Sequence, residues 1–355
     1  MTRLALCSAR WISATLALSL LGCGAQDPSA PAGEARTVEG TLTAESAPAG
    51  FPAGPVTQSA PPDNPLSEAR AQLGRRLFYE TGLSRTREIS CASCHQQEYA
   101  FADPKPVSNG VDAQHGTRNA PALVNLAWSE HFFWDGRAAS LEEQAGQPIE
   151  NPVEMDLSLD DAVARLEAEP RYVNDFEASF GGPITTDALR KAIASFVRVL
   201  VSGASPYDRH LAGDDRQFDS AAANGEELFF SEKAGCFHCH PPGALTNDGL
   251  FNNGSFSTGG DEGRKAVTGR TGDLGKFKVP GLRNIAVTAP YMHDGSLATL
   301  RAVVEQYAAG GRGHPSTDPQ ILPLHLAAAD IEDLLAFLNT LTDEAFLNDP
   351  RFGAP

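Results

Sequence analysis

Cysteine is scarce in this chain of 355 residues, and its placement excludes a fold held together by disulfides. Six cysteines are present, and two of them, Cys7 and Cys23, lie within the first two dozen residues. The other four form two Cys-x-x-Cys pairs, each followed directly by a histidine. Because those pairs have a chemical use of their own, described below, the folded part of the chain has no thiol left for a disulfide.

Basic residues are also few compared with acidic residues. The chain has 28 Lys and Arg against 45 Asp and Glu, which gives a formal net charge of −17. A surface of this sign repels phosphate backbones, so nucleic acid is not an expected partner. The same charge would attract a basic electron donor, although the simpler interpretation is that it keeps the protein soluble.

Long hydrophobic runs are lacking as well, apart from a short one near the start. The run at 11–21 follows two arginines and is too short to span a bilayer, so it has the form of an export signal. It ends in Leu-Leu-Gly before Cys23, which resembles a bacterial lipobox and predicts a lipoprotein signal peptide over 1–22. The alternative is ordinary cleavage near Ala25 with a soluble product. We predict an exported, periplasmic protein, anchored to the outer membrane by a lipid on Cys23 and touching the membrane in no other way.

The four remaining cysteines define two copies of one pattern: Cys91-Ala92-Ser93-Cys94-His95 and Cys236-Phe237-His238-Cys239-His240. Two thiols about one helical turn apart can form thioethers to both vinyl groups of one porphyrin, and the adjacent histidine can then bind its iron. A structural zinc site would need four ligands in one place, whereas these motifs lie far apart in the sequence. The pattern therefore predicts two covalently attached c-type haems, with His95 and His240 as iron ligands.

Composition and helical periodicity predict the domain organisation. Residues 23–64 are rich in Ala, Pro, Gly, Ser and Thr without an apolar period, which is typical of a disordered tether. We expect an N-terminal haem domain at 65–205, a C-terminal haem domain at 206–345 and a tail at 346–355. Each domain would hold one of the two motifs.

The apolar residues recur at helical spacing, and no convincing alternation of period two appears, so the predicted class is mainly α. Caps and apolar periods predict these helices: from Pro65 to Phe78, from Ser158 to a stop at Pro170, from Thr186 to Ser202, from Asn224 to Phe230, from Ser296 to Gly310, and from Asp330 to Leu341.

Several strings in the body resemble the bacterial di-haem cytochrome c peroxidase family, which includes peroxidases and MauG-like enzymes that oxidise protein residues. The strings are Arg118-Asn119-Ala120-Pro121-Ala122-Leu123, Phe133-Trp134-Asp135-Gly136-Arg137, Gln144, Asn151-Pro152-Val153-Glu154-Met155, Val279-Pro280-Gly281-Leu282-Arg283-Asn284, and Thr288-Ala289-Pro290-Tyr291-Met292-His293-Asp294-Gly295. The resemblance covers about 65 to 345. It implies two cytochrome c-like domains joined at a calcium-containing interface.

The resemblance also implies a division of labour. The N-terminal haem, bound by His95, would react with hydrogen peroxide, and the C-terminal haem, bound by His240, would transfer electrons. Trp134 would lie between the haems and couple them electronically. Gln144 and Glu154 would lie over the distal face of the first haem. A calcium ion would be held by Asn119 and the backbones of Thr288 and Pro290.

Each implied role has a plainer alternative. A carboxylate such as Glu154 can move the proton that cleavage of a peroxide bond requires, but an isolated glutamate is usually a solvated surface residue. Trp134 taken alone would be a core aromatic. Asn119 offers the oxygen that calcium prefers, and it could equally be a turn residue.

The sixth ligand of the second haem departs from the methionine-ligated peroxidases. The chain holds only Met1, Met155 and Met292, and Tyr307 occupies the position of the usual methionine. MauG-like members place tyrosine there, and a phenolate stabilises oxidised iron. Tyr307 is therefore the candidate ligand, with Met292 as the fallback and a buried core tyrosine as the alternative.

Three further positions bear on the branch of the family. His115 is the only histidine near enough to block the first haem at rest, but its spacing differs from that pattern, so we expect an open site. His293 is expected to bond a haem propionate or support the domain junction. MauG passes oxidising equivalents through a tryptophan at the position of Ala234, and this difference argues against a remote route of that kind here.

The predicted function is reduction of hydrogen peroxide at the N-terminal haem, with electrons passed through the C-terminal haem from a small cytochrome c or cupredoxin. One alternative is MauG-like oxidation of a protein residue or a small metabolite. Another, from a different class, is a non-catalytic di-haem electron-transfer cytochrome. A carrier has no need to keep Gln144 together with Glu154, which favours the enzyme.

Overall fold

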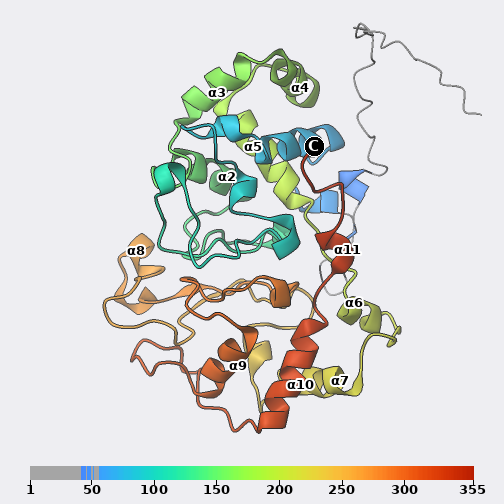
Figure 1. Ribbon diagram of the computed structural model, residues 1–355, viewed down its shortest axis with the longest axis vertical. Helices are drawn as coiled ribbons and strands as arrows, with labels where there is room; N and C mark the ends of the chain where they lie inside the picture. The colour runs from blue at the N-terminus through green and yellow to red at the C-terminus, as the bar shows by residue number, and fades with distance from the viewer. Residues whose placement is uncertain (1–40, 45, 49–50, 52–55) are drawn as a thin grey trace, which may run out of the picture. The chain divides into compact units, whose positions relative to one another are not determined.

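The computed structural model describes residues 41–44, 46–48, 51 and 56–355 (Figure 1). The predicted signal peptide, the acylation site at Cys23 and the first part of the tether lie outside the described residues. None of the helices in the described part of the chain is long and apolar enough to cross a membrane.

The N-terminal half is built from helices around the first Cys-x-x-Cys-His motif. These helices are α1 (Glu68–Phe78), α2 (Leu141–Glu150), α3 (Leu159–Glu167), α4 (Pro170–Phe180) and α5 (Thr186–Arg198). Four of them begin after a Ser or Thr side chain that accepts a hydrogen bond from the first helical turn, as at Ser158 and Thr185. The mainly helical prediction is confirmed.

The C-terminal half has shorter helices and one small sheet. Its helices are α6 (Pro206–Leu211), α7 (Ser220–Phe229), α8 (Lys265–Thr268), α9 (Leu300–Ala308), α10 (Ala328–Asn339) and α11 (Glu344–Leu347). Strand β1 (Leu250–Phe251) pairs antiparallel with β2 (Phe277–Lys278), with Leu250 opposite Lys278. The sheet was not predicted, because two-residue strands carry no measurable alternation.

The helix predictions missed α2, α4, α6 and the short helices α8 and α11. Pro170 was expected only to stop a helix, but it also occupies the first turn of α4, where its missing N–H is not needed. Helix α2 was not predicted, and Gly146 and Pro148 inside it obscure its apolar period.

Close helix crossings organise the core of each half. Helix α1 packs against α5 at Gly74, where an added Cβ would lie 1.9 Å from the backbone oxygen of Ala192. Helix α7 packs against α10 at Gly225, where the same atom would lie 1.9 Å from the oxygen of Asp333. Cys91 of the first motif packs against the core cluster that contains α1 and α5, and Cys236 of the second motif packs against the cluster that contains α7 and α10.

Parts of the predicted tether and tail belong to the packed structure. Leu42 and Val56, both fully buried, join the core cluster of the N-terminal half, and so do Phe346 and Phe352 from the other end of the chain. Isolated apolar anchors in a Pro- and Ala-rich stretch give no periodic signal, which explains why these residues were predicted as tether and tail.

Candidate active site

The first motif places His95 on the wall of a cavity. Cys91–Ser93 forms a single 3₁₀ turn (η4), which brings Cys91, Cys94 and His95 to one lining. The Nδ1 atom of His95 lies 2.7 Å from the carbonyl oxygen of Phe101 and must donate to it, because a carbonyl can only accept. Nε2 is then left unprotonated, as an iron ligand must be. Burial lowers the pKa of His95 and so also favours the neutral ring.

The second motif repeats this geometry. Cys236–His238 forms the 3₁₀ turn η8, and His240 Nδ1 donates to the carbonyl of Leu245, also at 2.7 Å. Burial lowers the pKa of His240 to about 4. Within the described residues, no three His, Cys, Asp or Glu side chains gather to hold a metal ion, so neither motif has the ligand set of structural zinc. Paired thiols with an oriented histidine fit covalent haem at both places.

A cavity of about 880 Å³ opens beside the first motif. Its lining includes Cys91, Cys94 and His95, apolar side chains such as Leu123 and Val197, and a few polar groups. Residues of the C-terminal half, among them Ala244, 246–249 and Lys278, line it as well. A largely apolar cavity with a few convergent polar groups is the usual form of a cofactor site.

Gln144 and Glu154 both line this cavity, as predicted. Gln144 comes from α2, and Glu154 lies in the turn that follows, where Asn151 Nδ2 donates to Glu154 Oε1 at 2.5 Å. Burial raises the pKa of Glu154, while the hydrogen bond from Asn151 and the charge of Arg137 oppose that rise. The structure therefore holds a carboxyl group with a raised pKa in a fixed position beside an amide.

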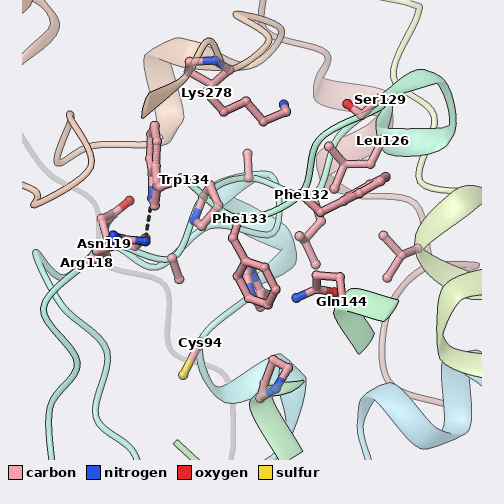
Figure 2. Close-up of a pocket in the computed structure, with 18 of the residues that line it drawn as sticks. Cys94, Arg118, Asn119, Leu126, Ser129, Phe132, Phe133, Trp134, Gln144 and Lys278 are labelled. Carbon is pink, nitrogen blue, oxygen red and sulfur yellow. Dashed lines mark hydrogen bonds between the residues drawn. The ribbon is translucent and has the colours of Figure 1, made fainter. Parts of the chain in front are cut away.

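Trp134 lines the cavity where the two halves meet. Its indole Nε1 donates to the carbonyl of Asn119 at 2.8 Å, drawn as the dashed line in Figure 2. Its own carbonyl accepts from the backbone N–H of Lys278, on β2, at 2.7 Å. Trp134 is thus fixed to the N-terminal half by its ring and to the C-terminal half by its backbone.

Asn119 lies against the loop that carries the other predicted calcium ligands. Its backbone N–H donates to the carbonyl of His293 at 2.8 Å, and its Nδ2 donates to Lys105 at 2.9 Å. Among the described residues, no hydrogen bond is donated to Asn119 Oδ1 or to the carbonyls of Thr288 and Pro290. Oxygens of this kind suit calcium.

Both candidate sixth ligands of the second haem approach one side chain. Asn253 Nδ2 lies 3.0 Å from the hydroxyl of Tyr307, on α9, and 3.5 Å from the sulfur of Met292. Burial raises the pKa of Tyr307 to about 12, and the hydrogen bond from Asn253 opposes the rise. A phenol in this position keeps its proton unless a nearby cation stabilises the phenolate. A bound ferric iron would be such a cation.

The remaining predicted positions are placed as follows. His115 is exposed on the cavity lining. His293 is buried and stacks on Phe277, with ring centroids 3.7 Å apart, at the junction of the halves. Ala234 is buried and leaves no aromatic side chain at that point.

Sequence reasoning gave no role to several residues of the site. Arg137 lines the cavity and stacks over Phe133, with its guanidinium carbon 3.4 Å from the ring centroid. Arg137 ends the family-like string Phe133-Trp134-Asp135-Gly136-Arg137, so the sequence did carry a signal for it. Phe101 and Leu245, which accept from the two histidines, gave no signal, because an acceptor carbonyl is independent of residue type.

The chain matches the family model described as di-haem cytochrome c peroxidase over residues 68–216. It is 39% identical over 294 residues to the methylamine utilization protein MauG of Methylorubrum extorquens, covering 82% of this chain and 83% of that one. It is 36% identical over 288 residues to the cytochrome c551 peroxidase of Pseudomonas aeruginosa, covering 78% and 80% of the two chains.

Two solved structures are similar to this chain in fold. A MauG-like protein associated with microbial copper homeostasis superposes with a TM-score of 0.79 at 38% identity, covering 83% of this chain and 95% of that one. The diheme peroxidase BthA of Burkholderia thailandensis superposes with a TM-score of 0.69 at 23% identity, over 81% and 90% of the two chains, a likeness of fold alone.

Proposed function

The chain belongs to the di-haem cytochrome c peroxidase family, and on this basis we propose that it reduces hydrogen peroxide to water in the cavity beside His95. Each peroxide takes up two electrons and two protons and yields two waters. The electrons would come from a small cytochrome c or cupredoxin and enter through the site at His240. The carboxyl group of Glu154, half-buried in the cavity of His95 with a raised pKa, carries the proposal.

The haem at each motif would be held by thioethers from the paired cysteines, with His95 and His240 as iron ligands. When bound, haem supplies the redox chemistry: it accepts and releases the electrons that reduce peroxide. Side chains of this protein move the proton, orient the peroxide and support electron transfer between the two sites.

Glu154 moves the proton. As a carboxylate it takes the proton from one peroxide oxygen, and as a carboxylic acid it delivers that proton to the other oxygen, which leaves as water. Asn151 fixes Oε1 of Glu154 at 2.5 Å, so the second carboxyl oxygen is the one available to substrate. Gln144, with an amide donor and acceptor, orients the peroxide beside it.

Trp134 supports transfer between the two sites. A half-buried indole that is hydrogen-bonded to Asn119, in a residue whose backbone is hydrogen-bonded to β2, has a fixed position between the halves. Calcium at Asn119, Thr288 and Pro290 would hold the same junction rigid. Tyr307, with Met292 as the alternative, would complete the second iron's ligands and keep that site closed to peroxide.

The MauG-like alternative, oxidation of a protein residue or a small metabolite, rests on the MauG relative and on Tyr307. Ala234 weighs against a remote route through the C-terminal half. We propose further that the protein is exported to the periplasm and anchored through Cys23.

The resting oxidised spectrum separates the peroxidase from an electron carrier. We expect one accessible, high-spin haem that reacts with peroxide and one low-spin haem. Two low-spin haems that do not react with peroxide in any redox state would instead identify the protein as an electron-transfer cytochrome. Peroxide turnover with a reduced cytochrome c, compared with turnover of candidate organic reductants, separates the peroxidase from the MauG-like oxidase.

A further inference from the structure

The end of the chain, residues 343–355, begins at the connection between the two halves. Asp343 is buried, and its Oδ2 accepts from Ser202 Oγ at 3.1 Å and from the N–H groups of Gly203 and Ala204 at 3.0 and 2.9 Å. Its own N–H donates to Asn284 Oδ1 at 2.8 Å. The start of this C-terminal segment is therefore fixed to residues of both halves.

The same segment ends on α1, in the N-terminal half. Arg75 Nε donates to the carbonyl of Gly353 at 2.7 Å, and the Tyr79 hydroxyl donates to the carbonyl of Phe352 at 2.9 Å. Arg75 is 5% exposed, so its charge is satisfied almost entirely by backbone carbonyls of the segment. Figure 1 shows the segment, in red, leaving α10, passing α11 and ending near the blue N-terminal helices.

Between these two attachments the segment packs on the loop that follows the first motif. The ring of Phe346 meets the ring of Phe101 edge-on, with centroids 5.9 Å apart. Gln97, two residues after His95, donates from Nε2 to the carbonyls of Phe346 at 3.2 Å and Asp349 at 2.8 Å. Phe101 is the residue whose carbonyl receives the Nδ1–H of His95.

The backbone of this loop needs such support. Ala100 and Phe101 have φ of 54° and 59°, in the left-handed region that non-glycine residues rarely adopt. A conformation of this kind persists only where its surroundings enforce it. The Phe101 ring is held by three aromatic side chains, Phe78, Phe196 and Phe346. Of these, Phe346 alone comes from the C-terminal segment.

We propose that the C-terminal segment is a positioning element for His95, with Phe346 and Gln97 as its contacts. By holding the Phe101 carbonyl in place, the segment keeps the hydrogen bond to Nδ1 short and the imidazole electron-rich, which strengthens it as an iron ligand. The inference rests on the proposed role of His95 in binding the first haem. It assigns to this C-terminal segment a role in setting that haem's potential.

The second haem motif serves as an internal control for the first, because its histidine makes the same kind of hydrogen bond in the other half of the chain. His240 donates to Leu245 at the same 2.7 Å, and Leu245 also has a left-handed φ, of 52°. Leu245, however, belongs to the core cluster of the C-terminal half, whereas Phe346 and Phe352 belong to that of the N-terminal half. Loss of the segment's contacts should therefore affect one haem and spare the other.

The test uses the full-length di-haem protein carrying Phe346→Ala, with Phe346→Leu as a milder variant in case the first does not fold. The readouts are the midpoint potential of each haem by spectroelectrochemistry and the iron–histidine stretching band of the reduced first haem. We expect the first haem's potential to rise and its band to move to lower frequency, because a less electron-rich imidazole stabilises oxidised iron less. The second haem should stay unchanged. Gln97→Met should act in the same direction.

Phe176→Ala is the matched control. Phe176 is equally buried in the same core but packs on Phe180 in α4, so its truncation should destabilise the protein without moving either potential. The inference is overturned if Phe346→Ala leaves the first haem as in the wild type, or if Phe176→Ala shifts it equally. A His95→Gly variant checks the premise: if it leaves the first haem unaltered, the proposed function itself fails.

Discussion

The carboxyl group of Glu154 shares the cavity wall with Gln144 and is fixed there by Asn151. Replacing it by glutamine keeps the shape and removes the proton acceptor. We expect Glu154→Gln to lower the rate of peroxide reduction by about 10²–10⁴-fold, the range that a positioned acid–base group contributes. Steady-state peroxide consumption with a reduced cytochrome c measures this. Glu150→Gln, which alters an exposed carboxylate at the end of α2, should leave the rate unchanged.

The same residue predicts the pH profile. Glu154 acts first as a base, so it must be deprotonated, and burial raises its pKa above the ordinary glutamate value. The rate should therefore fall as pH drops through this raised pKa, at a higher pH than a solvated glutamate would give. An acid limb that stays at the same pH in Glu154→Gln would show that another group is responsible.

Tyr307 and Met292, the two proposed sixth ligands of the second iron, both lie near Asn253 Nδ2. If the phenolate of Tyr307 binds the second iron, Tyr307→Phe should change the low-spin spectrum and raise that haem's potential, because the substitution removes an anionic ligand that stabilises oxidised iron. Met292→Leu should leave both nearly unchanged. The opposite pattern, measured by spectroelectrochemistry, would assign the ligand to Met292.

At the scale of elements, the crossing of α1 and α5 depends on Gly74. Alanine is the better helix former by about 0.5–1 kcal/mol, but here its Cβ would lie 1.9 Å from the backbone oxygen of Ala192. We expect Gly74→Ala to destabilise the protein by about 1–3 kcal/mol, the usual range for overpacking. Denaturant unfolding measures this. Gly182→Ala, where a Cβ meets nothing within 4 Å, is the control and should be nearly neutral.

The helices and haem motifs could be predicted because their signals are local. Ser158, for example, marks a cap by residue type, and Cys91 with Cys94 and His95 marks a haem by spacing. Helix α2 was not predicted because Gly146 and Pro148 interrupt its apolar period, although both are tolerated where the helix packs.

Of the candidate site, the residues within the family strings could be predicted, and the structure brings Gln144, Glu154 and Trp134 to one cavity. Phe101 could not, because its role lies in a backbone carbonyl.

At the scale of the whole molecule, charged residues next to Asn119 connect the two halves. Arg118, in the N-terminal half, binds Asp261, in the C-terminal half, through two hydrogen bonds of 2.6 and 2.9 Å, and also pairs with Asp135. Bidentate pairing of this kind fixes orientation as well as distance. The C-terminal segment adds a second connection, since Asp343 joins Ser202 and Asn284. Neither connection could be predicted, because both depend on residues remote in sequence.

The proposed calcium site at Asn119 predicts that the protein is sensitive to chelators. Treatment with a calcium chelator should lower the melting temperature and slow electron transfer between the haems, and added calcium should restore both. Asn119→Ala should resemble the chelated protein and respond little to further chelator. If the wild-type protein is indifferent to both treatments, the calcium proposal is wrong.

The most direct test of the central proposal is a titration of the fully reduced protein with hydrogen peroxide, followed by the absorbance of both haems. One peroxide takes two electrons, so one molecule per chain should oxidise both haems, and Trp134→Phe should slow oxidation of the second. Oxidation of only one haem per chain, or of neither, would contradict the proposal that peroxide is reduced beside His95 with electrons supplied through His240.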